Sequence, residues 1–392
     1  MIYVHVPFCV RKCNYCAFNS AVALSADKNL YVDALIREIN LHGNSSRVEK
    51  IHFGGQRDVA SNLADVFAEP NSSQVETIYF GGGTPTTLTL AQLEKIFDAL
   101  TKNFSVDKRA EVTIEANPST VDKNFLRGLR SLGFNRLSLG VQSFDDALLK
   151  IIGRLHDSQT AIDTISAAEK FFGNVSIDLM YGLPTQTLES LRRDVERVKN
   201  SDVQHVSIYG LEVEPGTKFF SDGVTVDENL CADMYEFITQ TLPTVGFRRY
   251  EISNFAVAGF ESRHNLGYWT GKKYFGFGAG AHGFDGKIRT SNIRDTSTYV
   301  QKIFAGEDVS TVEEVVTRQA AMEEFCFLGL RTVDGISAQT FEKNFGAQIF
   351  DVFGSAIEKN LQRGLLNVDG DRIFLTTRGL ALGNEVFADF LL

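Results

Sequence analysis

Three cysteines near the start of the chain form the residue group with the clearest chemistry. Residues 6–20 read VPFCVRKCNYCAFNS and hold Cys9, Cys13 and Cys16 within eight positions. A structural zinc site normally has a fourth close ligand, and no second CxxC or His pair accompanies this group. Three thiolates suit an iron-sulfur cluster with one iron left open, which offers a coordination position to a substrate or cosubstrate. The alternative is a chance grouping of cysteines, and the spacing argues against it.

Composition limits the environment and the partners of this site. The 392 residues carry a net charge of -10, which argues against a polyanion such as nucleic acid as the main ligand. No apolar run approaches the roughly 20 residues of a membrane span, and Met1 leads into a strand-like run with no cleavable leader. Cys231 and Cys326 stand alone in apolar helical contexts and predict buried thiols, with no disulfide framework. We therefore expect a cytoplasmic globular protein without a transmembrane segment.

Alternating elements must position the cysteines. Six apolar, β-rich runs alternate with amphipathic runs whose apolar residues recur three and four positions apart, which predicts a βα repeat with a parallel sheet, open or rolled into a barrel. The strands are expected at residues 3–8, 76–83, 111–118, 136–142, 175–184 and 205–213, and helices at 30–41, 89–100, 122–133, 158–172 and 187–198.

Polar and glycine residues collect at the carboxyl ends of these strands. Cys9 follows the first strand, the glycines from Gly81 follow the second, and Glu115, Gln142 and Asp178 end the next three. Because the carboxyl ends of parallel strands share one edge of the sheet, these residues should face one site.

The rest of the chain departs from this alternation. Residues 48–56 nearly repeat residues 75–85, and only the second copy continues into Gly-Thr-Pro, so residues 43–74 are expected to be an insertion. After residue 214 we expect a helix at 231–247, a strand at 248–256 and a glycine-rich aromatic segment at 263–284. From 312 onward the pattern is mostly helical, with a hairpin turn at Asp369–Gly370 and a winged-helix-like end.

Several motifs together carry a family resemblance. The CxxxCxxC run, with Tyr15 before its last cysteine, resembles the radical S-adenosylmethionine (SAM) superfamily, and GGGTPTTL, TIEANPST, LSLGVQSF, IGRLH and IDLMYGLP follow in the order of its HemN and HemW branch. This branch contains oxygen-independent coproporphyrinogen oxidases and heme chaperones. The resemblance implies an α/β fold, with a partial (β/α)6 barrel followed by a mainly helical C-terminal domain. The expected division is a radical SAM core at 1–230, a connecting region at 231–310 and a HemN-type domain at 311–392.

The resemblance also implies cofactors and the residues that bind them. Cys9, Cys13 and Cys16 would ligate a [4Fe-4S] cluster whose fourth iron is chelated by the amino and carboxylate groups of SAM. An electron from the cluster would then cleave SAM into methionine and a 5'-deoxyadenosyl radical. The positions that match contacts to this first SAM are Tyr3, Gly82 and Glu115, and those that match a second SAM are Tyr15, Gly83, Thr84, Gln142, Arg154 and Asp178.

The chemistry of these residues agrees with such roles. Glycines let backbone amides approach a charged ligand. Glu115 and Asp178 can accept hydrogen bonds from ribose hydroxyls or an ammonium group, and Arg154 can pair with a carboxylate. Ordinary ion pairing at a barrel rim is the alternative for each of them.

A second motif, HNLGYW at residues 264–269, contains the only tryptophan of the chain. Imidazole is a common ligand of heme iron, and aromatic side chains can pack on a porphyrin face; a capped turn with core aromatics is the alternative. The pattern resembles the heme chaperones, which implies heme contacts by His264, Asn265, Tyr268 and Trp269. His282 is either an accessory ligand or a glycine-loop histidine, and His5 is expected to line the cluster site without ligating iron.

Three functions then compete. The first is a heme chaperone that transfers heme to an acceptor such as a respiratory hemoprotein. Such a chaperone would receive electrons from a flavodoxin or ferredoxin and could form a homodimer. The second is oxidative decarboxylation of coproporphyrinogen III, and the third is a class C radical methyltransferase. The oxidases carry CxxxCxxCxC, and Phe18 stands at the last of these positions. Phe18 therefore disfavours the second function, while HNLGYW favours the first.

Overall fold

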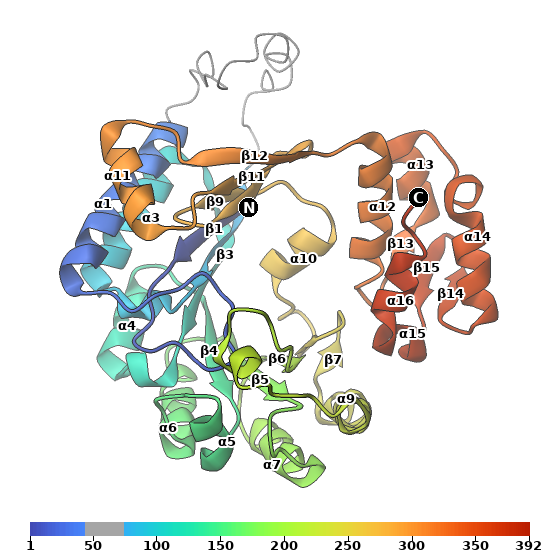
Figure 1. Ribbon diagram of the computed structural model, residues 1–392, viewed down its shortest axis with the longest axis horizontal. Helices are drawn as coiled ribbons and strands as arrows, with labels where there is room; N and C mark the ends of the chain where they lie inside the picture. Colours follow the sequence, from blue (N-terminus) through green and yellow to red (C-terminus); the bar gives the residue numbers. More distant parts are fainter. Residues whose placement is uncertain (44–73) are drawn as a thin grey trace.

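Six parallel strands form the centre of the structure, a computed structural model that describes residues 1–43 and 74–392. They are β1 (Ile2–Val6), β2 (Val75–Gly82), β3 (Val106–Ala116), β4 (Arg136–Gln142), β5 (Val175–Tyr181) and β6 (His205–Gly210). Each strand pairs with the next in sequence, and β1 runs parallel to β2 with Ile2 opposite Ile78. Both the expected six strands and their parallel βα arrangement are confirmed (Figure 1).

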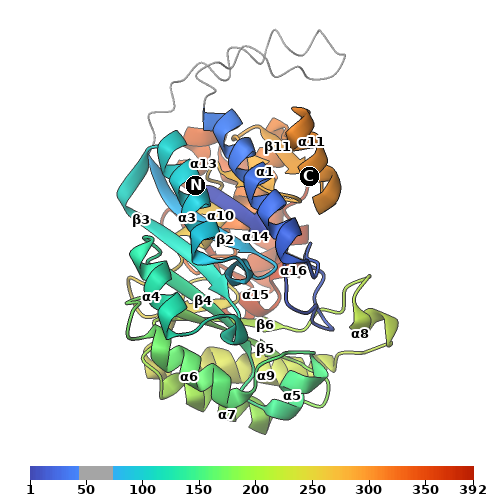
Figure 2. The ribbon, with the colours of Figure 1, turned by 90° about the vertical axis from the view of Figure 1, so that its left-hand side faces the viewer.

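Helices cover the outer face of this curved sheet (Figure 2). Side chains alternate along each strand, so Ile78 and Phe80 of β2 are fully buried in the apolar layer that includes the helices, while Tyr79 points to the inner side. Thr89 and Asp157 cap the helices that follow them. The helices of this layer are α1 (Ser25–Gly43), α3 (Leu90–Asn103), α4 (Lys123–Ser131), α5 (Asp146–Ile151), α6 (Ser158–Ala168) and α7 (Leu188–Lys199).

Short strands extend the sheet at both edges. At one edge β9 (Phe275–Phe277) lies parallel to β1; at the other β8 (Asn254–Ala256) lies antiparallel to β6 and is followed by β7 (Arg248–Arg249). The single strand expected at 248–256 is therefore wrong. The backbone N–H of Ser253 donates to Glu251 Oε1 at 2.7 Å, and this turn folds the segment into two short strands.

The segments between the barrel and the last helices are more varied than the sequence suggested. They comprise α8 (Lys218–Ser221), α9 (Glu228–Thr241), a 3-10 turn (Leu242–Val245), α10 (Arg263–Trp269), β10 (His282–Phe284), β11 (Ile288–Asn292), α11 (Thr296–Ala305) and β12 (Ser310–Val315). β10, β11 and β12 form a separate antiparallel sheet, so residues 312–315 are extended rather than helical. The copy of the near-repeat at 75–85 is the barrel strand, as expected. The first copy, at 48–56, and nearly all of the expected insertion at 43–74 lie outside the described residues.

The C-terminal segment has its own apolar core. Cys326, Phe341, Phe353, Ile373 and Phe390 are buried together in it. Its elements are α12 (Arg318–Gly329), β13 (Ile336–Ser337), α13 (Ala338–Phe345), α14 (Ile349–Gln362), β14 (Leu366–Asp369), β15 (Arg372–Leu375), α15 (Thr377–Ala381) and α16 (Gly383–Ala388). The order of helices and three antiparallel strands is that of a winged helix.

Two details of the sequence interpretation need correction. The expected hairpin forms between β14 and β15, but its loop residues are Gly370 and Asp371, because Asp369 still pairs with Arg372. Gly370 supplies the positive φ of 56° that this turn needs. Cys326 is buried as expected, whereas Cys231 is only half-buried. No helix in the described ranges has the length and apolar character to cross a bilayer.

Candidate functional site

The loop that carries the three cysteines is fixed at several points. Cys9 N donates to Ala21 O at 3.0 Å and Ala21 N donates to Pro7 O at 2.9 Å, which closes the loop at its base. Asn14 Nδ2 donates to the carbonyl of Ile151 at the end of α5, at 2.8 Å. The loop is therefore held in a defined shape over the carboxyl end of the barrel.

The cysteine side chains are suited to hold an iron-sulfur cluster. All three thiols are free and half-buried. Thr84 Oγ1 donates to Cys9 Sγ at 3.6 Å, and Arg154 Nη1 donates to Cys13 Sγ at 3.5 Å. Such N–H and O–H donors stabilise the negative charge of a ligated cluster.

The three cysteine side chains do not meet at one point in the described structure. Across residues 1–43 and 74–392, no three His, Cys, Asp or Glu side chains converge closely enough to hold one metal ion. A [4Fe-4S] cluster binds each thiolate to a different iron, so its ligands surround it instead of meeting at a point. Burial raises the pKa of Cys16, and bound iron would favour its thiolate form.

The glycine loop after β2 packs directly against the cysteine loop. Gly83 N donates to Val6 O at 2.9 Å, and Thr84 N donates to Phe8 O at 2.7 Å. A Cβ at Gly83 would lie 2.7 Å from Phe8 O, and one at Gly82 would lie 2.5 Å from His5 Cε1. Only glycine allows this close approach, so the two loops form one unit.

Glu115 lies under the glycine loop, on the inner side of the sheet. It accepts hydrogen bonds from Tyr79 OH at 2.7 Å and from Gly82 N at 3.2 Å. Burial raises its pKa to about 7, with Asp178 adding a smaller effect in the same direction. Tyr3 lies beside them, since its ring stacks near Tyr79 at 6.3 Å between centroids.

Asp178 on β5 and Arg154 in the loop between α5 and α6 lie in the same interior. Ser138 Oγ donates to Asp178 Oδ1 at 3.1 Å, and burial raises the pKa of Asp178. The guanidinium of Arg154 bonds to Gly140 O as well as to the Cys13 sulfur, while its Nε has no partner among the described residues. An unpaired buried N–H beside the cluster loop is the kind of donor that an anionic ligand group would satisfy.

Gln142 adopts a backbone conformation that is rare for a side-chain-bearing residue. Its φ is 72°, at a bulge in the β4 and β5 ladder. Strained residues of this kind concentrate at binding sites, where the surrounding structure holds them in place. Gln142 Nε2 lies near the guanidinium of Arg154, because both would contact a Cβ built at Gly140, at 3.1 and 3.2 Å.

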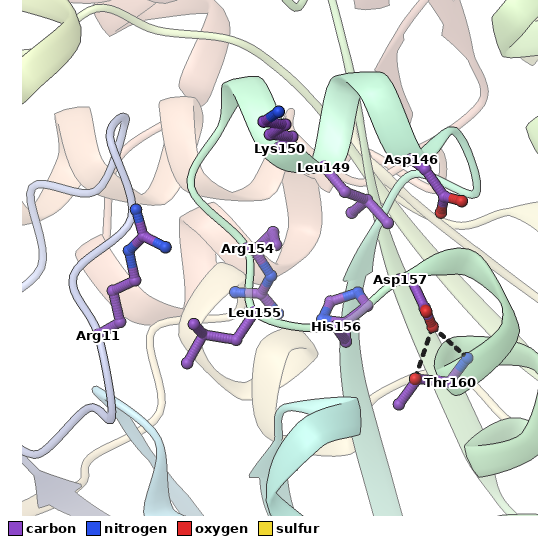
Figure 3. Close-up of a pocket in the computed structure, with 9 residues that line it drawn as sticks. All are labelled: Arg11, Asp146, Leu149, Lys150, Arg154, Leu155, His156, Asp157 and Thr160. Carbon is purple, nitrogen blue, oxygen red and sulfur yellow. Dashed lines mark hydrogen bonds between the residues drawn. The ribbon is translucent and has the colours of Figure 1, made fainter.

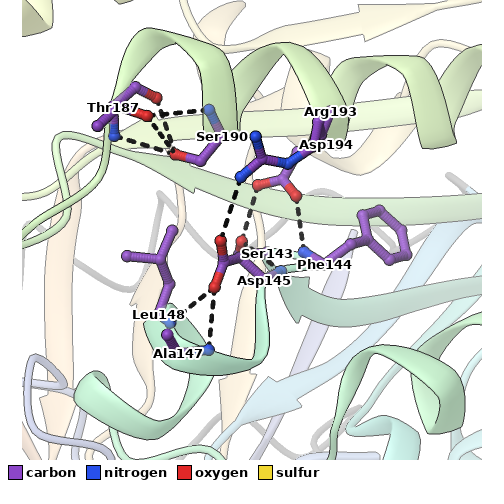
Figure 4. Close-up of polar contacts among 9 residues, drawn as sticks. All are labelled: Ser143, Phe144, Asp145, Ala147, Leu148, Thr187, Ser190, Arg193 and Asp194. Carbon is purple, nitrogen blue, oxygen red and sulfur yellow. Dashed lines mark hydrogen bonds and ion pairs between the residues drawn. The ribbon is translucent and has the colours of Figure 1, made fainter.

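Asp194 of α7 holds the turn that follows Gln142 (Figure 4). It accepts hydrogen bonds from Ser143 Oγ and from Phe144 N, both at 2.8 Å, and only 1% of it is exposed. Arg193 reaches Asp145 in the same turn at 3.5 Å. Helix α7 therefore fixes the backbone on which Gln142 depends.

The HNLGYW motif forms α10, which lies inside the open side of the barrel. Glu111 of β3 accepts the N–H groups of Arg263 and His264 at 3.1 Å and so caps this short helix. His264 is 1% exposed. Its Nδ1 lies 2.8 Å from Thr77 Oγ1 and its Nε2 lies 3.1 Å from Tyr268 OH.

Both ring nitrogens of His264 are therefore hydrogen-bonded in this conformation. Burial lowers its pKa to about 3, so it is neutral near pH 7. Its ring stacks on Tyr79, which contacts Glu115, so the motif is linked to the glycine-loop site. Ligation of heme iron by His264 would require one of its two hydrogen bonds to be exchanged.

The other motif residues lie on different sides of α10. Asn265 is half-buried, and no hydrogen bond of its side chain appears among the described residues. The guanidinium of Arg331, which follows α12, lies 4.4 Å from the centre of the Trp269 ring. His282 is distant from them, in β10, where it pairs with Glu313 at 3.1 Å.

The structure thus brings the cysteines and the expected SAM residues to one end of the barrel and encloses His264 deeper inside it. His5 lies next to Gly82, and its Nε2 is 2.9 Å from Asn19 O. Tyr15 is half-buried against the apolar cluster around Leu148. Sequence reasoning missed Tyr79 and Asp194. The strand alternation that places Tyr79 on the face of Gly81 could have revealed the first, whereas Asp194 carries no local signal.

This architecture defines the class of protein to which the chain belongs. An open barrel of six parallel strands, a fixed loop with three free cysteines after the first strand, and a glycine loop after the second form the core of a radical SAM protein. Comparison with known families agrees, because the model of the radical SAM superfamily matches residues 3–198 and that of the HemN C-terminal domain matches residues 316–382.

Relatives of similar length indicate the family within this superfamily. The heme chaperone HemW of Bacillus subtilis is 36% identical, over 99% of this chain and 98% of its own length. The HemW of Lactococcus lactis is 35% identical, over 100% and 97%. The structure of coproporphyrinogen III oxidase (HemN) of Escherichia coli superposes with a TM-score of 0.81 at 24% identity, over 100% of this chain and 89% of that one, which supports the shared fold. The chain belongs to the radical SAM superfamily and, within it, to the HemW family. Membership of the superfamily implies a [4Fe-4S] cluster and SAM.

Proposed function

We propose that this protein is a heme chaperone, which binds heme and transfers it to an acceptor protein. The observation that carries the proposal is Phe18, which is 67% exposed on the cluster loop at the position where the oxidases have a further cysteine. The names of its full-length relatives support the same function. Oxidation of coproporphyrinogen III is the second candidate, since the HemN C-terminal domain and the HemN fold are both present. A class C methyltransferase is the third, and no feature of the described residues favours it.

The residues at the barrel end fit the implied cofactors. Cys9, Cys13 and Cys16 would hold the cluster, which when bound supplies an open iron for SAM and the electron that cleaves it. Gly82, with Tyr3 and Glu115, would bind the first SAM molecule. Glu115 can accept a hydrogen bond from the amino N–H of SAM, and Gly82 leaves room for the ligand beside the backbone.

A second SAM molecule would contact a neighbouring set of residues. Arg154 would pair with its carboxylate through the side chain whose Nε lacks a partner among the described residues. Asp178 and Gln142 would accept and donate hydrogen bonds from adjacent strands. The remaining members of this predicted set are Tyr15, Gly83 and Thr84.

The heme assignment of the α10 motif remains a prediction. His264 would ligate the iron after its bond to Tyr268 opens, with Asn265, Tyr268 and Trp269 beside the porphyrin. The unpaired indole N–H of Trp269, buried with no partner among the described residues, supports a ligand or rearrangement near this helix.

We infer the broader setting from the sequence resemblance and from composition. The acceptor would be a respiratory hemoprotein or another apo-protein, and the reductant a flavodoxin or ferredoxin. We propose a cytoplasmic location, a possible homodimer and no nucleic-acid partner, in line with the net charge of -10. We also propose the division into 1–230, 231–310 and 311–392; the separate apolar core of the last part supports it.

One parallel experiment tests the function. Anaerobically reconstituted protein is titrated with hemin and, separately, incubated with reductant, SAM and coproporphyrinogen III. The chaperone predicts one hemin per chain and no decarboxylated product. Formation of decarboxylated porphyrinogen, or no hemin binding, would contradict the proposal.

Cluster ligation is tested by a matched pair of variants. Cys13→Ala should lose most of its iron and its iron-sulfur absorbance, because only two thiols remain. Cys231→Ala, which removes a half-buried thiol outside the loop, should retain both. A full cluster in Cys13→Ala would overturn the assignment of the cysteines.

A further inference from the structure

An open pocket of about 480 Å³ lies beside the cluster loop, on the α5 and α6 side (Figure 3). Arg11 lies on the cluster-loop side, Asp146 and Asp157 lie on the far side, and Arg154 and Leu155 lie between them. Asn14 N donates to Ile152 O at 3.0 Å and holds the loop against α5. The volume falls within the roughly 300–1,000 Å³ typical of ligand sites.

Two of the three cations that line this pocket are free, and each of its two carboxylates already accepts a hydrogen bond. No residue in the described part of the chain forms a hydrogen bond or ion pair with Arg11 or Lys150, and both side chains are exposed. Asp146 accepts the N–H of Ser158 at 2.7 Å, and Asp157 accepts the N–H of Thr160 at 2.8 Å. The pocket therefore offers unpaired positive charge on a chain whose net charge is -10.

Of the remaining polar lining residues, His156 offers no charge. His156 is 4% exposed; its Nδ1 lies 3.1 Å from Asn117 Oδ1, and its Nε2 lies 3.1 Å from Val141 O. The N–H groups at the start of α6 are capped by Asp146 and Asp157, so a phosphate could not bind there through the backbone. The guanidinium of Arg154, the third cation of the lining, already donates to Gly140 O and to Cys13 Sγ. Arg11 and Lys150 are therefore the lining cations whose side chains are free to bind an anion in this pocket.

Apolar surface continues from the pocket along the loop. Leu155 is 48% exposed and Val10 is 55% exposed. Both line a narrow extension of the pocket that reaches Cys13 and shares Arg11 with it. A ligand here would combine negative groups with a flat apolar body and would lie next to the cluster.

We propose that this pocket binds the two propionate carboxylates of heme, one at Arg11 and one at Lys150, with the macrocycle against Leu155 and Val10. The proposal rests on the proposed chaperone function and names the place of its cargo. It requires no rearrangement, in contrast to iron ligation by His264. It places the cargo where the occupancy of the cluster site can influence it.

Three porphyrins separate carboxylate binding from iron ligation. Reconstituted full-length protein is titrated with hemin, with iron-free protoporphyrin IX and with protoporphyrin IX dimethyl ester, at one detergent concentration. The pocket predicts similar affinity for the first two and at least tenfold weaker binding of the ester, because its carboxylates are blocked. Binding of hemin but not of protoporphyrin IX would overturn the pocket and favour an iron ligand.

Variants locate the site. Arg11→Gln and Lys150→Gln should each weaken hemin binding about three- to tenfold, and the double variant should bind hemin as weakly as the wild type binds the ester. Lys12→Gln removes a neighbouring exposed charge that does not line the pocket and should bind hemin normally. Iron content and circular dichroism confirm that each variant is folded.

The failures of the two proposals are distinguishable. Wild-type affinity in the double variant would overturn the pocket and leave the chaperone function intact. Absence of hemin binding by the wild type would overturn the chaperone function and the pocket together.

Discussion

Replacing Asp194 by alanine should loosen the turn that positions Gln142. Among the described residues, the Asp194 carboxylate is the only acceptor for the Ser143 hydroxyl and for the Phe144 N–H. The Ser143 hydroxyl oxygen in turn accepts the N–H of Asp145. Both bonds are 2.8 Å long and lie where water does not reach Ser143, which is fully buried. Without them, no other contact in the turn replaces the acceptor.

The expected size of the effect follows from these two donors. A buried donor left unpaired costs about 1–3 kcal/mol, so the loss of the acceptor for two donors in Asp194→Ala should lower the free energy of unfolding by about 2–6 kcal/mol. Asp194→Asn keeps one carbonyl acceptor and should lose about half as much. Arg193→Ala breaks only the surface pair with Asp145 and should cost less than about 1 kcal/mol.

The pKa of Asp194 predicts the direction in which the folding stability changes with pH. Burial raises the pKa of Asp194 from 3.8 to about 6. A carboxyl whose folded pKa is raised contributes stability that is present below pH 3.8 and is lost as the pH rises through about 6. The stability of the wild type relative to Asp194→Asn should therefore fall between pH 4.5 and pH 7.

Urea unfolding at both pH values and SAM affinity by calorimetry provide the measurements. Asp194→Ala should bind SAM more weakly than Arg193→Ala does, because Gln142 loses its fixed backbone. An unchanged urea midpoint with unchanged SAM affinity would refute the role of Asp194 as a support for Gln142.

Two further predictions concern the glycine-loop site. SAM affinity should rise about tenfold from pH 6 to pH 8, because Glu115 has a pKa of about 7 and its ionised form is the acceptor for the amino N–H of SAM. Binding by Glu115→Gln should be nearly independent of pH, and a titration as steep as that of the wild type would exclude Glu115 as the group responsible. Gly83→Ala should reduce the iron content after reconstitution, because its Cβ would lie 2.7 Å from the carbonyl oxygen of Phe8 and would separate the two loops. The control is Gly173→Ala, whose Cβ would meet no atom within 4 Å. Equal iron content in both variants would contradict the argument.

The sequence predicted the barrel well because its strands carry a strong local signal. Each inner polar residue, such as Ser138 in β4, stands between apolar residues that pack outward. β9 was missed, since three residues within a glycine-rich run have no periodicity to detect. The hairpin of β7 and β8 was read as one strand because its turn depends on the Glu251 side chain rather than on glycine or proline.

The candidate site was predictable to a similar extent. Residues after strand ends converge wherever parallel strands share an edge, which is why Glu115 and Asp178 lie in one interior. The burial of His264 could not be predicted, because it depends on where α10 inserts. The support from Asp194 comes from a helix about 50 residues away, and no short-range pattern encodes it.

The position of β1 has a consequence for biosynthesis. β1 pairs with β2 on one side and with β9 on the other, and Asn19 Nδ2 bonds the carbonyls of Ala279 and Arg294, which follow it by 260 and 275 residues. At about 5–20 residues per second, a ribosome needs on the order of tens of seconds to supply these partners. The cysteine loop emerges first but receives these supports only when Arg294 has been made. Cluster insertion into a correctly shaped loop is therefore delayed until late in synthesis, and nascent chains shorter than about 295 residues should be unable to retain iron.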